Sequence, residues 1–68
     1  MNVKEQREDV EKMIESITIN EEYLSDWEAK FIEDMEYNLS EPGYVFTARQ
    51  IEKIWQIQQK VREIGLDL

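Results

Sequence analysis

With 68 residues, 41% of them hydrophobic, the chain is long enough for one small folded domain and no more. Its 16 acidic and eight basic residues give a net charge of −8, which disfavours direct contact with the phosphates of nucleic acids. The chain contains neither cysteine nor histidine, which excludes disulfide bonds and removes the commonest ligands of transition metals.

The sequence also limits the expected location. No apolar run is long enough to span a bilayer, and residues 1 to 12 lack the apolar segment of a signal peptide. The absence of cysteine is typical of a reducing compartment. We therefore predict a cytoplasmic protein that makes no contact with membranes.

An amphipathic pattern predicts the first helix over residues 3 to 17. The expected inner face, with Ile14 beside it, is formed by Val3, Gln6, Val10, Met13 and Ile17. This stripe is as narrow as a coiled-coil seam, so the helix should pack on the rest of the chain or on a second copy. The residues from Thr18 to Asn20 favour extended and turn conformations and should end the helix.

A capping box predicts the start of the second helix, over residues 26 to 39. Ser25 is followed three residues later by Glu28, which is the spacing at which the two residues satisfy each other's backbone N–H groups. The expected core stripe, with Ile32 alongside, is formed by Trp27, Phe31, Met35 and Leu39. Trp27 is accordingly predicted to be a core residue.

The segment from Ser40 to Phe46 contains the only proline of the chain, next to Gly43, and is the clearest turn in the sequence. Seven residues suffice for an antiparallel return, so the second and third helices should form a hairpin. The apolar residues of this loop, Tyr44 to Phe46, should pack against the open end of that hairpin.

The third helix is predicted over residues 48 to 64 and begins with a second capping box, formed by Thr47 and Gln50. Its expected core stripe, with Trp55 at the edge, is formed by Ile51, Ile54, Ile57, Val61 and Ile64. Gly65 should adopt the left-handed conformation that ends many helices, and Leu66 should then contact Val61. The whole chain, residues 1–68, is predicted to be one all-α domain of three helices.

The acidic residues are concentrated in the middle of the chain, where residues 13 to 41 contain nine acids and one base. Carboxylates arranged along a helix can resemble DNA phosphates and occupy a basic surface of another protein. The alternative is an acidic surface that only favours solubility. The residues expected to bind a partner are Asp26, Glu28, Glu33, Asp34, Glu36 and Trp55. At the edge of its stripe, Trp55 fits a core position and a binding anchor equally well.

The sequence offers little for catalysis. A nucleophile with its base normally requires histidine, cysteine or a buried lysine. The densest carboxylates, Glu33, Asp34 and Glu36, should face solvent rather than converge in a cleft. We therefore expect a non-enzymatic protein with no bound metal and no cofactor.

Two other functions remain open. Arg49, Lys53 and Lys60 should lie near one side of the third helix, close to Trp55, which would suit an accessory nucleic-acid-binding module. The chain could instead be a structural or assembly protein that acts through oligomerisation, and the narrow seam of the first helix makes a homodimer plausible.

The sequence "LSDWEAKFI" followed by "TARQIEKIWQIQQKV" resembles a small helical-hairpin module of bacteriophage and prophage proteins, over roughly residues 24 to 61. The matching positions are Ser25, Asp26, Trp27, Glu28, Phe31, Thr47, Gln50, Ile51, Ile54 and Ile57. Such modules occur alone or attached to replication and DNA-processing proteins. The resemblance implies expression in the cytoplasm of a host cell, and suggests a DNA-mimic-like inhibitor, such as an anti-CRISPR protein, of a host nucleic-acid-handling protein.

Overall fold

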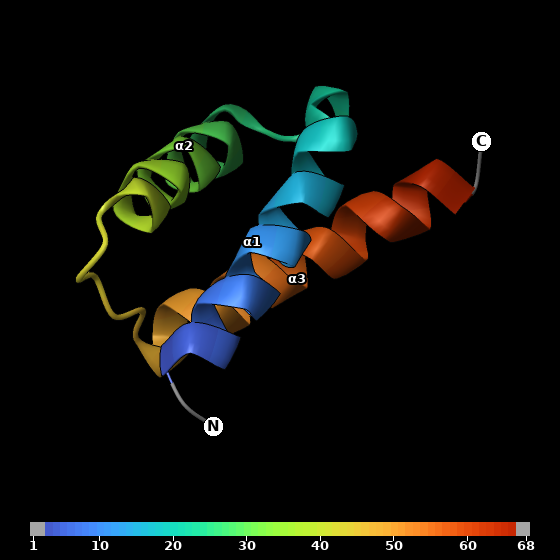
Figure 1. Ribbon diagram of the computed structural model, residues 1–68. Coiled ribbons are helices and arrows are strands. Elements are labelled where there is room, and N and C mark those ends of the chain that lie inside the picture. The colour runs from blue at the N-terminus through green and yellow to red at the C-terminus, as the bar shows by residue number, and fades with distance from the viewer. Residues whose placement is uncertain (1–2, 67–68) are drawn as a thin grey trace.

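The computed structural model describes residues 3–66, and within this range it contains three α-helices, one 3-10 turn and no strand (Figure 1). The elements are α1 (Val3–Ile19), η1 (Glu21–Tyr23), α2 (Asp26–Ser40) and α3 (Ala48–Leu66). The prediction of an all-α chain with three helices is therefore confirmed.

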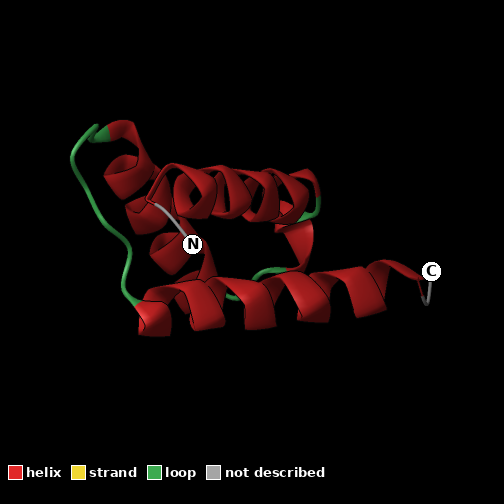
Figure 2. Ribbon diagram, turned by 60° about the horizontal axis from the view of Figure 1, so that its bottom comes forward, coloured by secondary structure: helices red, strands yellow, loops and turns green. Residues whose placement is uncertain are grey.

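The first helix is the one on which both others pack. α1 makes most of the contacts between helices, chiefly with α3 and secondly with α2. Figure 2 shows α1 and α3 running in the same direction, one above the other, with α2 at the side of the pair. α2 and α3 do meet through the side chains of Glu28 and Lys60, but a close antiparallel hairpin of these two helices is not confirmed.

The core draws residues from all three helices and from the loop before α3. Its nine buried hydrophobic residues are Val10, Ile14, Ile17, Ile32, Met35, Phe46, Ile54, Ile57 and Val61. Most of them belong to the predicted stripes, because residues that repeat at intervals of three and four share one side of a helix. Within the loop, Phe46 is buried, Tyr44 is half-buried and packs edge-on against it, and Val45 is exposed.

The prediction that Trp27 is a core residue is wrong, because its side chain is 54% exposed. The buried residues of α2 are instead Glu28, Ile32 and Met35, which follow one another at intervals of four and three. Trp27 lies beside this stripe. Its indole ring faces Lys53 of α3, with the Lys53 Nζ atom 4.9 Å from the ring centroid.

Both capping boxes are present, as predicted. The Glu28 carboxylate accepts a hydrogen bond from the backbone N–H of Ser25 at 2.9 Å. At the start of α3, the Gln50 N–H donates to the Thr47 hydroxyl at 3.1 Å, and the Thr47 N–H donates to the Gln50 side-chain oxygen at 2.9 Å. The sequence therefore located both helix starts correctly.

All three helices end later than predicted, α2 by one residue and α1 and α3 by two residues each. α1 continues to Ile19, and the Thr18 hydroxyl donates to the Ile14 carbonyl at 2.8 Å, which accommodates this polar residue in a helical turn. α3 continues through Gly65, and no described glycine has a positive φ, so the prediction of a left-handed cap at Gly65 is wrong. Glycine is tolerated in a helix, at a cost of about 1 kcal/mol relative to alanine. The predicted contact of Leu66 lies outside the side chains that the structure describes.

Arg7 fastens α1 to the end of α2 and to the following loop. Its guanidinium group donates to the carbonyl oxygens of Glu41 and Tyr44, each at 3.1 Å, and to that of Leu39. These carbonyls lie at or beyond the negative end of the α2 dipole, where a cation is favourable. One half-buried arginine therefore positions α2 beside α1.

Candidate docking surfaces

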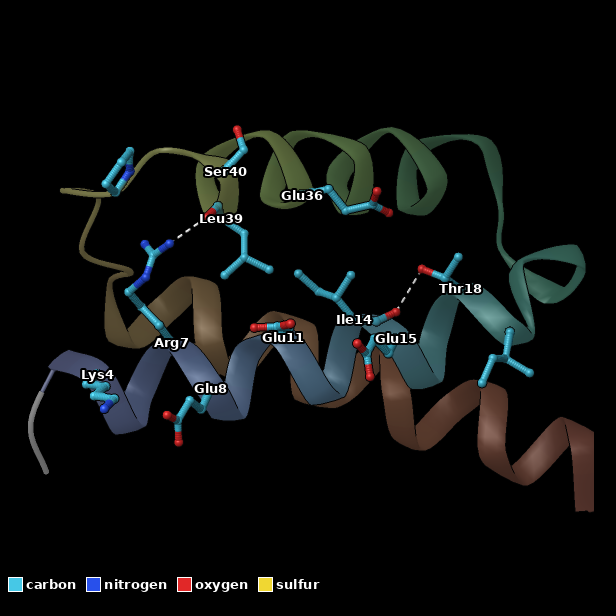
Figure 3. Close-up of a pocket in the computed structure, with 12 residues that line it drawn as sticks. Lys4, Arg7, Glu8, Glu11, Ile14, Glu15, Thr18, Glu36, Leu39 and Ser40 are labelled. Carbon is cyan, nitrogen blue, oxygen red and sulfur yellow. Dashed lines mark hydrogen bonds between the residues drawn. The ribbon is translucent and has the colours of Figure 1, made fainter.

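An open groove of about 1050 Å³ runs between α1 and α2 (Figure 3). The residues that line it are Lys4, Arg7, Glu8, Glu11, Ile14, Glu15, Thr18, Ile19, Glu36, Leu39, Ser40 and Pro42. The α1 residues follow one another at helical intervals, so they form one continuous edge. The α2 residues, with Pro42 beyond them, form the other edge.

The floor of the groove is apolar. Ile14 points from α1 towards α2, and Leu39 points from α2 towards α1 (Figure 3). Ile14 is buried and Leu39 is half-buried. At the end of α1, Ile19 also lines the groove, although 81% of its surface is exposed. The groove therefore presents hydrophobic surface that the rest of the described chain leaves uncovered.

The rim of the groove is acidic. Glu8, Glu11 and Glu15 follow one another on α1, and Glu36 lines the same groove from α2. In Figure 3 the Glu8 side chain points away from α2. All four are exposed, and none forms an ion pair with another residue among positions 3–66. We refer to these four residues as the acidic rim. Since these four carboxylates outnumber the two cations of the lining, Lys4 and Arg7, the net charge along the groove is negative.

The predicted acidic face is only partly realised. Asp26, Glu33, Asp34 and Glu36 are exposed, as expected of a solvent-facing set, but only Glu36 lines the groove. Residues two positions apart in an α-helix differ by about 200° of rotation about the helix axis, which is equivalent to about 160° in the other direction. Asp34 and Glu36 therefore point to nearly opposite flanks of α2. The structure brings Glu36 together with Glu8, Glu11 and Glu15 of α1 instead, three residues that the sequence analysis did not single out.

The assignment of Glu28 to the exposed acidic face is wrong. Its residue surface is 4% exposed, and its Oε1 atom lies 2.7 Å from Nζ of Lys60. The Ser25 hydroxyl donates to the same oxygen at 3.0 Å. Burial acts to raise the pKa of this carboxyl, but the hydrogen bonds from Lys60 and Ser25 and the Lys60 charge together hold the pKa below its usual value. Glu28 is therefore a buried anion with its partners already in place.

The alternative function, an accessory nucleic-acid-binding module, requires a basic surface formed by Arg49, Lys53 and Lys60. This surface is not free of contacts within the chain. Lys60 binds Glu28, and Lys53 lies over the Trp27 ring. Arg49 and Lys53 line a small hollow of about 430 Å³, which also contains Phe31 and Glu52. The aromatic residues in contact with this region are thus Trp27, over which Lys53 lies, and Phe31 in the hollow.

Trp55 lines a different groove, between α1 and α3. This groove has a volume of about 740 Å³ and is lined by Gln6, Asp9, Lys12, Met13, Ala48, Ile51, Glu52 and Trp55. Trp55 is 52% exposed, while Met13 and Ile51 are half-buried. Trp55 therefore has the exposure expected of an aromatic anchor, but it lies apart from the acidic rim.

Within residues 3–66, no three histidine, cysteine, aspartate or glutamate residues are grouped so that they could hold a metal ion. The helices of this range are also too short or too polar to cross a membrane. Comparisons with protein-family models, with curated proteins and with solved structures found no match to this chain.

Proposed function

We propose that this chain is a non-enzymatic protein-interaction module that binds a basic region of a partner protein through the groove between α1 and α2. The observation that carries the proposal is the acidic rim, in which four exposed carboxylates, without ion pairs among residues 3–66, line a groove with an apolar floor. Opposite charge accelerates association and favours partners that carry lysine and arginine at the contact.

The partner we propose is a nucleic-acid-handling protein. Proteins of this class expose lysine and arginine where they contact phosphates, and the acidic rim offers anions at helical spacing that compete for those side chains. The module would then act as a DNA-mimic-like inhibitor of its partner. The resemblance of residues 24 to 61 to a bacteriophage module supports a host protein, including a CRISPR nuclease, as the target.

Affinity capture with two charge-reversed variants tests this proposal. One variant carries Glu11→Lys, Glu15→Lys and Glu36→Lys in the acidic rim. The matched control carries Glu21→Lys, Glu22→Lys and Glu63→Lys, which change the net charge equally at exposed positions outside the groove. We expect the native chain and the control to capture the same DNA- or RNA-handling protein from bacterial lysate, and the rim variant to lose it.

Duplex DNA added during capture gives the second readout. If the module occupies the basic surface that normally holds nucleic acid, duplex DNA will displace the captured protein. Equal capture by the rim variant and the control would refute the proposal. Capture that depends on the rim but resists duplex DNA would retain the interaction module and reject DNA mimicry.

Self-association is the second candidate function, and the α1–α3 groove favours it. Exposed Trp55 lies beside half-buried Met13 and Ile51 there, and apolar surface of this kind is typical of protein contacts. Light scattering at high protein concentration tests this candidate. A dimer that becomes monomeric in Trp55→Ser would support it, and a native chain that stays monomeric would reject it.

A further inference from the structure

We infer that the groove between α1 and α2 receives one amphipathic helix of the partner, with an apolar stripe against the floor and lysine or arginine residues against the acidic rim. This inference depends on the proposed function and makes it more specific. It distinguishes insertion of a helix from the docking of a flat basic surface.

The length of the groove suits a helix. Its α1 edge extends from Lys4 to Ile19, which corresponds to about 22 Å along the helix axis at about 1.5 Å per residue. A partner helix of about 15 residues matches this length. An amphipathic helix laid in a groove contacts it through residues at intervals of three and four, and the lining residues of α1 already follow that spacing.

A partner that offers only positive charge would not fill the groove, because the floor of the groove is apolar. Ile14 and Leu39 face each other across the groove (Figure 3), and Ile19 lines it at the end of α1 with 81% of its surface exposed. Ile14 is already buried by the fold, but a flat cationic surface that contacts only the rim would leave Leu39 and Ile19 in water. Burying them against leucine or isoleucine residues of a partner adds favourable free energy, at about 25 cal/mol per Å² of apolar area.

The charge of the rim decides between possible occupants. A second copy of this chain carries a net charge of −8, so its approach to four carboxylates is unfavourable. A neutral apolar helix would leave the rim carboxylates partly desolvated and without partners. The two cations of the lining, Lys4 and Arg7, offset only part of the charge of the four carboxylates. The occupant that satisfies both floor and rim is cationic and amphipathic.

Binding of three synthetic peptides of about 15 residues, the length that spans the groove, tests the inference by fluorescence anisotropy at low salt. The first is an amphipathic helix with leucine on one stripe and lysine on both flanks. The second has the same composition in scrambled order, and the third has glutamine in place of lysine. We expect only the first to bind well, with the other two weaker by about tenfold, equivalent to about 1.4 kcal/mol.

Two variants of the chain locate the bound peptide. Ile19→Ser removes exposed apolar surface from the groove, and we expect it to weaken binding of the first peptide about fivefold. Val45→Ser is the matched control, because Val45 is 55% exposed but does not line the groove. Both positions are exposed, so neither change should unfold the chain, and circular dichroism checks this.

Each outcome separates the two proposals. Equal binding of the scrambled peptide, together with unchanged binding by Ile19→Ser, would show that charge acts alone. That result overturns the helix inference and leaves the proposed function intact. Failure of the first peptide to bind would also overturn the inference. The proposed function is refuted by a different result, which is equal capture of the partner by the rim variant and its control.

Discussion

Lys60 of α3 donates a hydrogen bond to the Glu28 carboxylate of α2 at 2.7 Å, and this contact fastens the first turn of α2 to the later half of α3. The same carboxylate closes the capping box at Ser25. One oxygen atom thus both starts a helix and holds it against another. Because Glu28 is almost fully buried, its ionised form depends on having these partners in place.

Replacing Lys60 with methionine should destabilise the chain by leaving the Glu28 charge buried without its cation. Removing one member of a fully buried pair costs about 3 to 5 kcal/mol, but Lys60 is 45% exposed, so we expect a loss of about 1 to 2 kcal/mol in the free energy of unfolding. Urea unfolding followed by circular dichroism measures it. Arg62→Met, at an exposed neighbour, is the control. Equal losses for both variants would contradict the structural role of Lys60.

The stability of the chain should fall in acid partly because Glu28 becomes protonated. The folded state holds the pKa of Glu28 below its usual value, so the ionised form stabilises folding at neutral pH. That contribution is lost as the pH falls through the usual glutamate range and then through the lower pKa of the folded state. The stability difference between the native chain and Glu28→Gln should therefore be largest near neutral pH and shrink in acid. Urea unfolding at a series of pH values measures it, and a constant difference would refute this account.

Local sequence signals were sufficient to predict the helices and their starts. The capping boxes at Ser25 and Thr47 use side chains three residues away, so no distant part of the chain is needed to recognise them. Most of the buried stripe of α3 was predicted in the same way, because periodicity alone assigns one side of a helix to the core.

The packing of the helices could not be predicted in the same way. Charge favours an exposed position for Glu28, and only the approach of Lys60, 32 residues away, makes its burial favourable. Once Glu28 faces inward, Trp27 is displaced from the core stripe. The rim likewise combines Glu36 with Glu15 and with Glu8 and Glu11 from the nearly neutral residues 1 to 12, so it appears only when α2 lies beside α1.

Arg7 is the structural residue that a closer analysis of the sequence could have found. Arg7, Val10, Ile14 and Ile17 follow one another at intervals of three, four and three, and the last three are buried. A cation on the line of a core stripe indicates a specific partner at that end of the helix. That partner is the set of carbonyl groups at the end of α2 and in the loop.

Replacing Arg7 should loosen the end of α2 and the loop that follows. Arg7→Met removes a charged donor from three carbonyl groups, and we expect it to lower the free energy of unfolding by about 2 kcal/mol. Arg7→Lys should recover only part of the loss, because an ammonium group cannot reproduce the planar set of donors. Hydrogen exchange should show faster exchange at the amide of Tyr44, which donates to the Glu41 carbonyl. Full rescue by lysine would show that charge alone is required.

Two isoleucines of contrasting exposure provide a final test of the packing. Ile54 is 0% exposed at the centre of the core, whereas Ile19 is 81% exposed in the groove. Removing one methylene group by Ile54→Val should cost about 1 kcal/mol, because the loss of buried area is joined by a small cavity. Ile19→Val should change the free energy of unfolding by less than about 0.5 kcal/mol, as is usual at the surface. Urea unfolding of both variants measures the contrast. A comparable cost at Ile19 would mean that the groove is closed over this residue in solution, and its apolar floor would then be unable to receive a partner helix.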